Sequence, residues 1–386
     1  MSELYKLPTG WEWKDYKDVL INISSKPFQV LKSEYLGDGI FPIVDQSKDF
    51  IVGYSSDESK LYENKDNCVI FGDHTRQIKF VDFPFVIGAD GTKILKSKND
   101  NDIKFLYYQL LSKNIKSLGY SRHFKLVKEF NFAIPKPTEQ KRIVAKLDNL
   151  FKKIDKAIEL HQRNITSANT LMASTLDKTF KKLEEEYSLE KLNDISEIIS
   201  GYAFKSSDFN QSDGIKSIKI TNVGVKEFVR DSYFLPIGLA EKLSRFRVLS
   251  GDIVIALTRP YISNGLKIAT VPVDYDKAFL NQRVASIRSM IDKSINIYIY
   301  YYLSTNNILK EVRELSKTLN QPNLSVKDLS SFKIPLPPLP IQQQTVEYLD
   351  SISTKVDEIK KLNEQKLADL KALKASILDK AFRGEL

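Results

Sequence analysis

Residues 132–137 read FAIPKP, and the chain returns to nearly the same letters, FKIPLP, at residues 332–337. Comparison of residues 147–180 with residues 349–382 then gives 12 identities in 34 aligned pairs, at an offset of 202. An internal repeat of this length indicates that one structural unit occurs twice in the chain. We therefore predict two copies of a unit of roughly half the chain, with two residues inserted near 338–340 in the second copy.

Each copy continues from the FxIPxP segment into a long stretch with helical spacing. Apolar residues recur alternately every three and four positions, which is typical of the seam of a coiled coil. Further apolar residues widen this stripe, so we expect the helices to pack against more than each other. The seam positions are Leu147, Phe151, Ile154 and Ile158 in the first copy, and Leu349, Ile352, Val356 and Ile359 in the second.

The segment before each FxIPxP motif is expected to form a mixed sheet with a late helix. Apolar runs such as CVIFG at residues 68–72 and GDIVIAL at residues 251–257 are typical of strands. A helical pattern follows at residues 102–115 in the first domain and at residues 295–315 in the second. The predicted fold class is α+β: two mixed α/β domains alternate with two long antiparallel coiled-coil helices in an internal two-fold pseudo-repeat. The predicted boundaries are 1–137 and 187–337 for the domains, and 138–186 and 338–386 for the helices.

Composition narrows the class of protein. The 386 residues are 42% hydrophobic and include only 15 Gly and 14 Pro, which excludes collagen-like and wholly disordered chains. The single cysteine, Cys68, excludes an internal disulfide and a multi-thiolate metal site, and it suits a reducing, cytoplasmic compartment. The first residues lack the apolar core of a signal peptide, and INIYIYYYL from Ile295 is too short to span a bilayer. We expect a cytoplasmic protein without a membrane partner.

No catalytic pattern is present. The histidines His74, His123 and His161 are too scattered to suggest a metal site. The chain has no GxxxxGK phosphate loop, no GxGxxG or GxSxG motif, and no Asp/Asn-Pro-Pro-aromatic box of an amino-methyltransferase. The Glu139-x-Lys141 pair lacks the preceding carboxylates of a nuclease centre and is better explained as a charged first helical turn. We predict a non-enzyme with no catalytic, cofactor-binding or metal-binding residues.

Several loops combine arginine, amide and aromatic side chains, which suit DNA bases. Residues 187–337 carry a net charge of +5 and seven of the twelve arginines, against +2 for residues 1–137. Any one loop is also consistent with ordinary turn chemistry, and the recurrence in both domains is what favours DNA. The candidates in the first domain are His74, Arg76, Thr92, Lys93, Arg122 and His123. Those in the second are Tyr202, Lys205, Thr258, Arg259, Tyr261, Asn264, Asn281, Gln282, Arg283, Asn320, Gln321 and Asn323.

These features together resemble the specificity subunit of type I restriction-modification systems. The resemblance rests on GWEWKDYKDV at residues 10–19, FGDHTRQIKFVDFPFVIGADGTKIL from residue 71, the paired IPxP-to-helix segments and the C-terminal ILDKAFRGEL, and it covers essentially the whole chain. It implies two target-recognition domains and two conserved helices. It also implies that two methyltransferase subunits dock on this chain and that restriction subunits join them. The partners would use S-adenosylmethionine to methylate adenine N6, and ATP with Mg²⁺ to translocate and cut DNA; no cofactor is expected in this chain.

A recognition domain reaches only a few base pairs of a major groove, so two different domains predict an asymmetric, bipartite DNA site with an unread spacer. The similar helices should meet the same kind of partner twice. Two alternatives stay open: a coiled-coil assembly scaffold that does not bind DNA, and a component of a fused restriction enzyme with its own activity. The Glu-Gln pair of the family's hinge is matched at 139–140 but by Gln342-Gln343 in the second copy, which leaves the start of that helix open.

Overall fold

The computed structural model describes residues 5–88, 90–263, 265–316 and 322–386. Three of the candidate DNA-binding residues, Asn264, Asn320 and Gln321, lie outside these described ranges.

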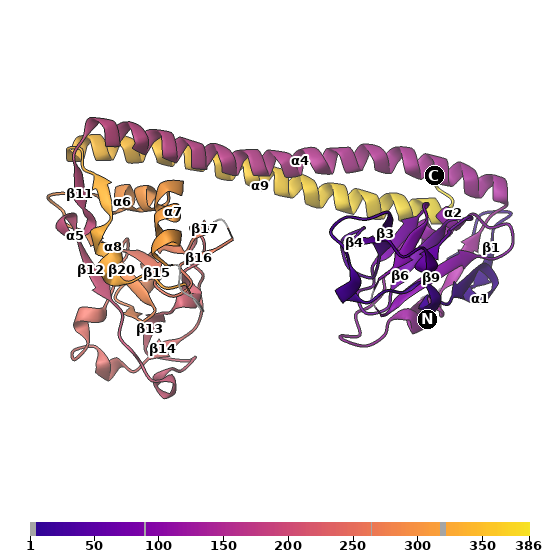
Figure 1. The fold of residues 1–386 in the computed structure, drawn as a ribbon, viewed down its shortest axis with the longest axis horizontal. Helices are drawn as coiled ribbons and strands as arrows, with labels where there is room; N and C mark the ends of the chain where they lie inside the picture. The colour runs from indigo at the N-terminus through magenta and orange to yellow at the C-terminus, as the bar shows by residue number, and fades with distance from the viewer. Residues whose placement is uncertain (1–4, 89, 264, 317–321) are drawn as a thin grey trace. The chain divides into compact units, whose positions relative to one another are not determined.

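The chain divides into two compact units. The first comprises Met1–Gln162 with Glu364–Leu386, and the second comprises Arg163–Asn363. Both units contain part of each long helix, α4 (Pro137–Glu186) and α9 (Leu339–Arg383), which are drawn in magenta and yellow in Figure 1.

The first unit is built on an antiparallel sheet with the strand order β2-β9-β6-β7. A second sheet, β4-β3-β8-β5, packs on one face of it, and Ile70 and Ile94 meet Val44 and Ile87 in the core between the sheets. Helix α2 (Ile103–Ser112) packs on the other face. The strands are β2 (Leu20–Ile23), β3 (Phe41–Val44), β4 (Gly53–Ser55), β5 (Leu61–Tyr62), β6 (Cys68–Gly72), β7 (Ile78–Val81), β8 (Phe85–Ile87) and β9 (Thr92–Ser97).

The second unit repeats this plan. Its main sheet has the order β12-β20-β15-β18, a smaller sheet β14-β13-β19 packs on one face, and α6 (Asn296–Leu303) packs on the other. A short hairpin, β16 (Tyr261–Ile262) with β17 (Gly265–Leu266), is inserted after β15. The strands are β12 (Ser196–Ser200), β13 (Ile215–Ile218), β14 (Phe234–Leu235), β15 (Ile253–Ala256), β18 (Ile268–Thr270), β19 (Phe279–Leu280) and β20 (Val284–Ser289).

The main sheets of the two units correspond strand for strand, whereas β5 of the first unit and the β16–β17 hairpin of the second have no counterpart among the described strands. The main sheets have the same order and directions, and in the smaller sheets β3 and β8, like β13 and β19, are the parallel pair. The predicted fold class is therefore confirmed, and the repeat extends through globular segments whose sequences align poorly. The buried CVIFG strand is apolar throughout because both of its faces are covered, by α2 and by the second sheet.

The helical pattern at 295–315 forms two helices instead of one. Helix α6 ends at Leu303, and α7 (Asn306–Leu315) begins after it. The Ser304 hydroxyl donates to the Tyr300 carbonyl, and the Thr305 hydroxyl accepts from the Ile308 amide as an N-cap. These local hydrogen bonds end one helix and start the next.

Each FxIPxP segment closes its unit as an edge strand. β10 (Asn131–Ile134) pairs with β1 (Glu12–Asp15), and β21 (Lys333–Pro335) pairs with β11 (Leu189–Lys191). Short helices, α1 (Tyr16–Val19) and α5 (Leu192–Ile195), lead from β1 and β11 into the main sheets.

A buried glutamine ties each long helix to its unit. The Gln140 side chain accepts from the Asp102 amide at the start of α2 and donates to the Pro135 carbonyl. The Gln342 side chain accepts from the Ile295 amide at the start of α6 and donates to the Pro337 carbonyl. Gln342 is therefore the equivalent of Gln140, whereas the sequence comparison matched Gln140 with Gln343. Since Pro337 is likewise the equivalent of Pro135, the two residues inserted in the second copy lie before Pro337 and not at 338–340.

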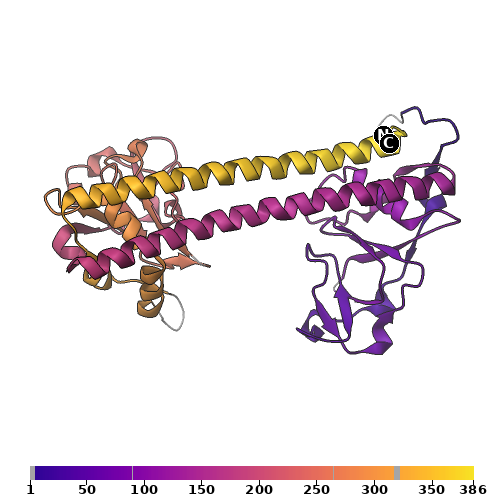
Figure 2. The same cartoon turned by 90° about the horizontal axis from the view of Figure 1, so that it is seen from above.

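The long helices run antiparallel against each other in both units (Figure 1, Figure 2). In the first unit Lys374 forms an ion pair with Asp155, and in the second unit the Asn164 side chain donates to that of Asn363. The helices also pack on α2 and α6, where Tyr108 donates to Asp148 and Tyr301 donates to Asp350, each at 2.5 Å. The apolar stripe therefore serves two partners at once, as its width predicts.

The predicted seam positions differ in burial. Leu147, Phe151, Ile154, Leu349 and Val356 are buried, Ile158 and Ile352 are partly buried, and Ile359 is 41% exposed.

Replacing Gln342 by alanine should lower the free energy of unfolding by about 2–3 kcal/mol, because the Ile295 amide and the Pro337 carbonyl lose their partner in a buried site. Denaturant unfolding measures this change. Gln344→Ala removes an exposed amide from the same helix and should stay within about 0.5 kcal/mol of the wild type. Equal losses in both variants would show that the buried hydrogen bonds of Gln342 do not stabilise the fold.

Candidate nucleic-acid interface

In the second unit, most of the described candidates lie at one edge of the main sheet. Ser200 at the end of β12 pairs with Ala285, and Ala256 at the end of β15 pairs with Val284, the first residue of β20. The loops that leave these strand ends therefore meet. We call residues 201–205, 257–263, 281–283 and 322–323 the second loop edge.

Backbone hydrogen bonds hold these loops together. The Arg259 amide donates to the Pro322 carbonyl at 2.8 Å, and Thr258 pairs with Asn323 in an isolated bridge. The Leu257 amide donates to the Arg283 carbonyl at 2.9 Å. Arg259, Arg283 and Asn323 are exposed. Residues 24 to 64 positions apart in the chain thus present arginine and amide groups side by side.

Tyr202 anchors the other half of the second loop edge. Its backbone carbonyl accepts from the Gln282 amide, and it forms a bridge with Asn281. The ring stacks edge-on with Phe204 and lies 5.1 Å from that of Phe246, yet Tyr202 remains 39% exposed. Arg245, which the sequence analysis did not select, stands over the Phe246 ring. Lys205 is exposed just before a short 3₁₀ turn.

Positive charge dominates this edge. Burial, and secondarily the positive charge of Arg259, lower the pKa of Lys267. The Arg313 guanidinium stands over the Tyr261 ring and donates to the Ser263 carbonyl. Among the described residues, neither Arg259 nor Arg283 has an acidic partner within ion-pair distance. An electropositive edge of this kind attracts the DNA backbone.

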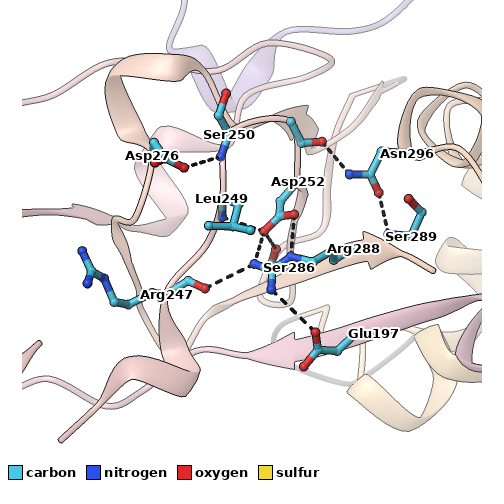
Figure 3. A network of polar contacts seen from close by, with 11 residues as sticks. Glu197, Arg247, Leu249, Ser250, Asp252, Asp276, Ser286, Arg288, Ser289 and Asn296 are labelled. Carbon is cyan, nitrogen blue, oxygen red and sulfur yellow. Dashed lines mark hydrogen bonds and ion pairs between the residues drawn. The ribbon is translucent and has the colours of Figure 1, made fainter. Parts of the chain in front are cut away.

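Arg288 serves a different purpose at the opposite end of the sheet. Figure 3 shows its guanidinium bonded to the carboxylate of Asp252 at 2.7 and 2.9 Å and extending toward Glu197. Asp252 is 2% exposed, and its hydrogen bond to Arg288 raises the pKa of that arginine. The excess of arginine in this unit is therefore only partly available for DNA, because Arg230 also pairs with Asp274.

In the first unit the candidates lie at the equivalent edge. Gly72 at the end of β6 pairs with Thr92, the first residue of β9. The turn after β6 meets the loop before β9, where the Asp73 amide donates to the Gly91 carbonyl. We call residues 73–77, 90–92 and 117–123 the first loop edge.

His123 holds this edge together from inside. It is 1% exposed; the Leu118 amide donates to its Nε2, so Nδ1 carries the proton and donates to the Asp73 carbonyl. The adjacent Phe124 amide donates to the Asp73 carboxylate, which lies 3.7 Å from the Lys93 ammonium. Thr92 is buried as well, at 2% exposure. His123 and Thr92 thus shape the edge without offering their side chains to solvent.

The exposed face of the first loop edge carries His74, Arg76, Tyr120 and Arg122. Tyr120 is fully exposed, and its ring centre lies 6.5 Å from that of His74. Gln46, which the sequence analysis missed, braces the turn: its side chain accepts from the His74 amide and donates to the Asp90 carbonyl. The only sequence signal for this role of Gln46 is its position just after β3, because that strand ends at the same edge of the domain.

Within the described ranges, no group of three or more His, Cys, Asp and Glu side chains is placed to hold a metal ion. The same ranges contain no helix that is both long enough and apolar enough to cross a membrane.

Comparison with known proteins agrees with this picture. A family model for the type I restriction modification DNA specificity domain matches residues 8–165 and 184–368. The chain is 29% identical over 417 residues to the specificity subunit of the type I restriction enzyme MjaVIII of Methanocaldococcus jannaschii, covering 99% of this chain and 94% of that protein. It is 23% identical over 374 residues to the specificity subunit of EcoR124I/EcoR124II of Escherichia coli, covering 93% and 91%.

Among solved structures, the fold is similar to a chain from a study of complex assembly and conformational transition of a type I restriction-modification system. The TM-score is 0.75 at 22% identity, and the match covers 99% of this chain and 100% of that chain.

Proposed function

This chain belongs to the family of type I restriction-modification DNA specificity subunits, and we propose that it directs its complex to a bipartite, asymmetric site in double-stranded DNA. The specificity subunit is the non-catalytic part of such a complex. The proposal rests on one observation: two topologically equivalent loop edges carry different exposed side chains. Because the two loop edges are placed equivalently, each can contact DNA in the same way. Because their exposed side chains differ, the two half-sites they recognise should differ in base sequence.

We assign residues 1–137 and 187–337 to the two target-recognition domains, and 138–186 and 338–386 to the conserved helices. The exposed residues of the two loop edges are the proposed DNA contacts. Thr92 and His123 are assigned to holding the first loop edge in shape.

The partners follow from the same proposal. Two methyltransferase subunits dock on the duplicated helices, with restriction subunits joining them, and the complex works in the cytoplasm where its DNA lies. The partners bind S-adenosylmethionine for adenine N6 methylation, and ATP with Mg²⁺ for translocation and cleavage. Exposed apolar residues on the helices supply docking surfaces in each unit: Leu160 and Leu373 in the first, and Leu171, Tyr348 and Leu362 in the second.

Reconstitution with a methyltransferase subunit of the same type I system tests the proposal. Sequencing of the modified DNA should show methylated adenines in two short, different half-sites separated by a fixed spacer. A chain that methylates DNA by itself would favour the fused-enzyme alternative. A complex that shows no sequence preference would favour the scaffold that does not bind DNA.

We expect DNA binding through the second domain to be the more salt-sensitive, in line with its net charge of +5 against +2 for the first. Arg283→Ala in the reconstituted complex should weaken binding and lower the slope of log affinity against log salt by about 1, the contribution of one phosphate contact. Fluorescence anisotropy across a salt series measures this slope. Arg230→Ala removes the same charge from an arginine that already pairs with Asp274, so it should change the slope less. An unchanged slope for Arg283→Ala would remove this residue from the interface.

A further inference from the structure

Two of the exposed arginines occupy the same position in the two units. Arg76 follows β6, five residues after Phe71, which pairs with the first residue of β7. Arg259 follows β15, four residues after Ile255, which pairs with the first residue of β18. Since β6 and β7 correspond to β15 and β18 in the sheet order, both arginines lie in the same loop of the repeated unit.

Both arginines also have the same unusual backbone. The φ angle is +63° at Arg76 and +47° at Arg259, in the left-handed region that favours glycine. Every residue with a Cβ atom pays free energy for this conformation. Lys226, Ser263 and Lys277 share it, so the conformation alone marks no site. The distinguishing feature is the recurrence of a strained, exposed arginine in the same loop of both copies.

The described surroundings leave N–H donors of each guanidinium available for a ligand. Arg76 Nη1 donates to the Ile115 carbonyl at 3.0 Å, which fixes one side of the group and leaves its other N–H donors available. Arg76 and Lys113 line the same surface hollow. Arg259 lies close enough to the buried Lys267 to lower its pKa, in addition to the larger effect of burial. Neither arginine has a carboxylate partner among the described residues.

We propose that Arg76 and Arg259 are matched specificity-determining residues, each of which reads one guanine in the half-site of its own domain. A phosphate contact needs only a positive charge, which many unstrained positions would supply. Bidentate recognition of guanine O6 and N7 in the major groove needs a rigid guanidinium at a fixed place, and this requirement accounts for arginine where glycine would fit the backbone better. The inference rests on the proposed function and adds that each half-site contains a guanine.

The test uses the complex with the methyltransferase subunits and labelled duplexes that carry the methylated motif of the wild type. In a second set of duplexes, 7-deazaguanine replaces one guanine at a time and removes only the N7 acceptor. Arg76→Gly and Arg259→Gly should each weaken binding by about 5- to 100-fold, since a bidentate pair discriminates on that scale. Neither variant should lower the melting temperature, because glycine suits the left-handed backbone.

The base analogue identifies the contact. In the wild type, 7-deazaguanine at one position of each half-site should weaken binding. The Arg76→Gly complex should lose this response in one half-site only, and the Arg259→Gly complex should lose it in the other. Arg76→Lys and Arg259→Lys retain the charge and should keep the salt slope, but their response to 7-deazaguanine should be smaller than in the wild type, because a flexible ammonium lacks the rigid fork of arginine. These lysine variants decide the question if a glycine variant fails to fold.

Lys277→Gly is the matched control. Lys277 is an exposed cation with a φ of +61°, but it precedes β19, at the end of the domain opposite the second loop edge. Its replacement should leave the response to every 7-deazaguanine unchanged. The inference is overturned if a half-site lacks guanine, if the arginine variants respond to the analogue like the wild type, or if both act on the same half-site. A wild-type complex that methylates no bipartite motif would instead contradict the proposed function.

Discussion

Replacing Leu349 by aspartate should lower the free energy of unfolding by about 3–5 kcal/mol, the scale of an uncompensated buried charge. Leu349 is fully buried in the core of the second unit, where it and Val346 of the same helix α9 pack with Phe332 and α6. A carboxylate there would lie among the apolar side chains of this core, and the neighbouring Asp350 already accepts from Tyr301. Denaturant unfolding, followed by circular dichroism, measures the loss. Leu147→Asp should act similarly in the first unit, where Leu147 is also fully buried.

Leu362→Asp is the control for this experiment. It introduces the same charge into the same helix and the same unit, but Leu362 is 61% exposed, so the change should stay within about 0.5 kcal/mol. A comparable loss in both variants would show that helix propensity, and not burial of charge, sets the effect. Retention of wild-type stability by Leu349→Asp would contradict the packing described for α9.

A fragment ending at Glu186 should form a homodimer, and the motif methylated with its help should become palindromic. The fragment lacks residues 364–386, which pack on the first unit: Leu378 and Phe382 are buried there, and the Phe382 ring lies 5.4 Å from that of Phe105. Without them the fragment exposes an apolar stripe, which favours association.

The fragment contains near-copies of the missing residues. At the repeat offset of 202, Leu176 and Phe180 correspond to Leu378 and Phe382, and in the full chain they pack on α6, the equivalent of α2. A second fragment can therefore place its Leu176 and Phe180 where Leu378 and Phe382 belong. The fit is tighter at one point, since Thr179 replaces the fully buried Ala381.

Light scattering gives the mass of the fragment, and sequencing after coexpression with the methyltransferase subunit gives its motif. We expect a dimer and two copies of the first half-site in inverted orientation. Phe180→Asp in the fragment should abolish dimerisation. A stable monomer at micromolar concentration, or an asymmetric motif, would contradict the exchange of equivalent helices.

The sequence by itself determined the duplication, the long helices and most of the strands. The duplication follows from the identities at an offset of 202 residues. The helices and strands follow from local periodicity: apolar residues at alternating three- and four-residue spacing form one helix stripe, and apolar runs such as CVIFG form buried strands. The family resemblance also depended on such local runs, and the FxIPxP repeat located both closing strands. Local patterns survive in the sequence because each depends only on residues close together in the chain.

Only the tertiary structure decided which globular features correspond and which side chains are available. The equivalence of the two loop edges depends on strand register, which is set by contacts between residues far apart in sequence. The same long-range contacts buried His123 and Thr92, bound Arg288 to Asp252, and aligned Gln342 with Gln140. The sequence does not distinguish a histidine or arginine that faces DNA from one that binds a buried carbonyl or carboxylate. The partner of such a side chain depends on residues that only the folded chain brings close to it.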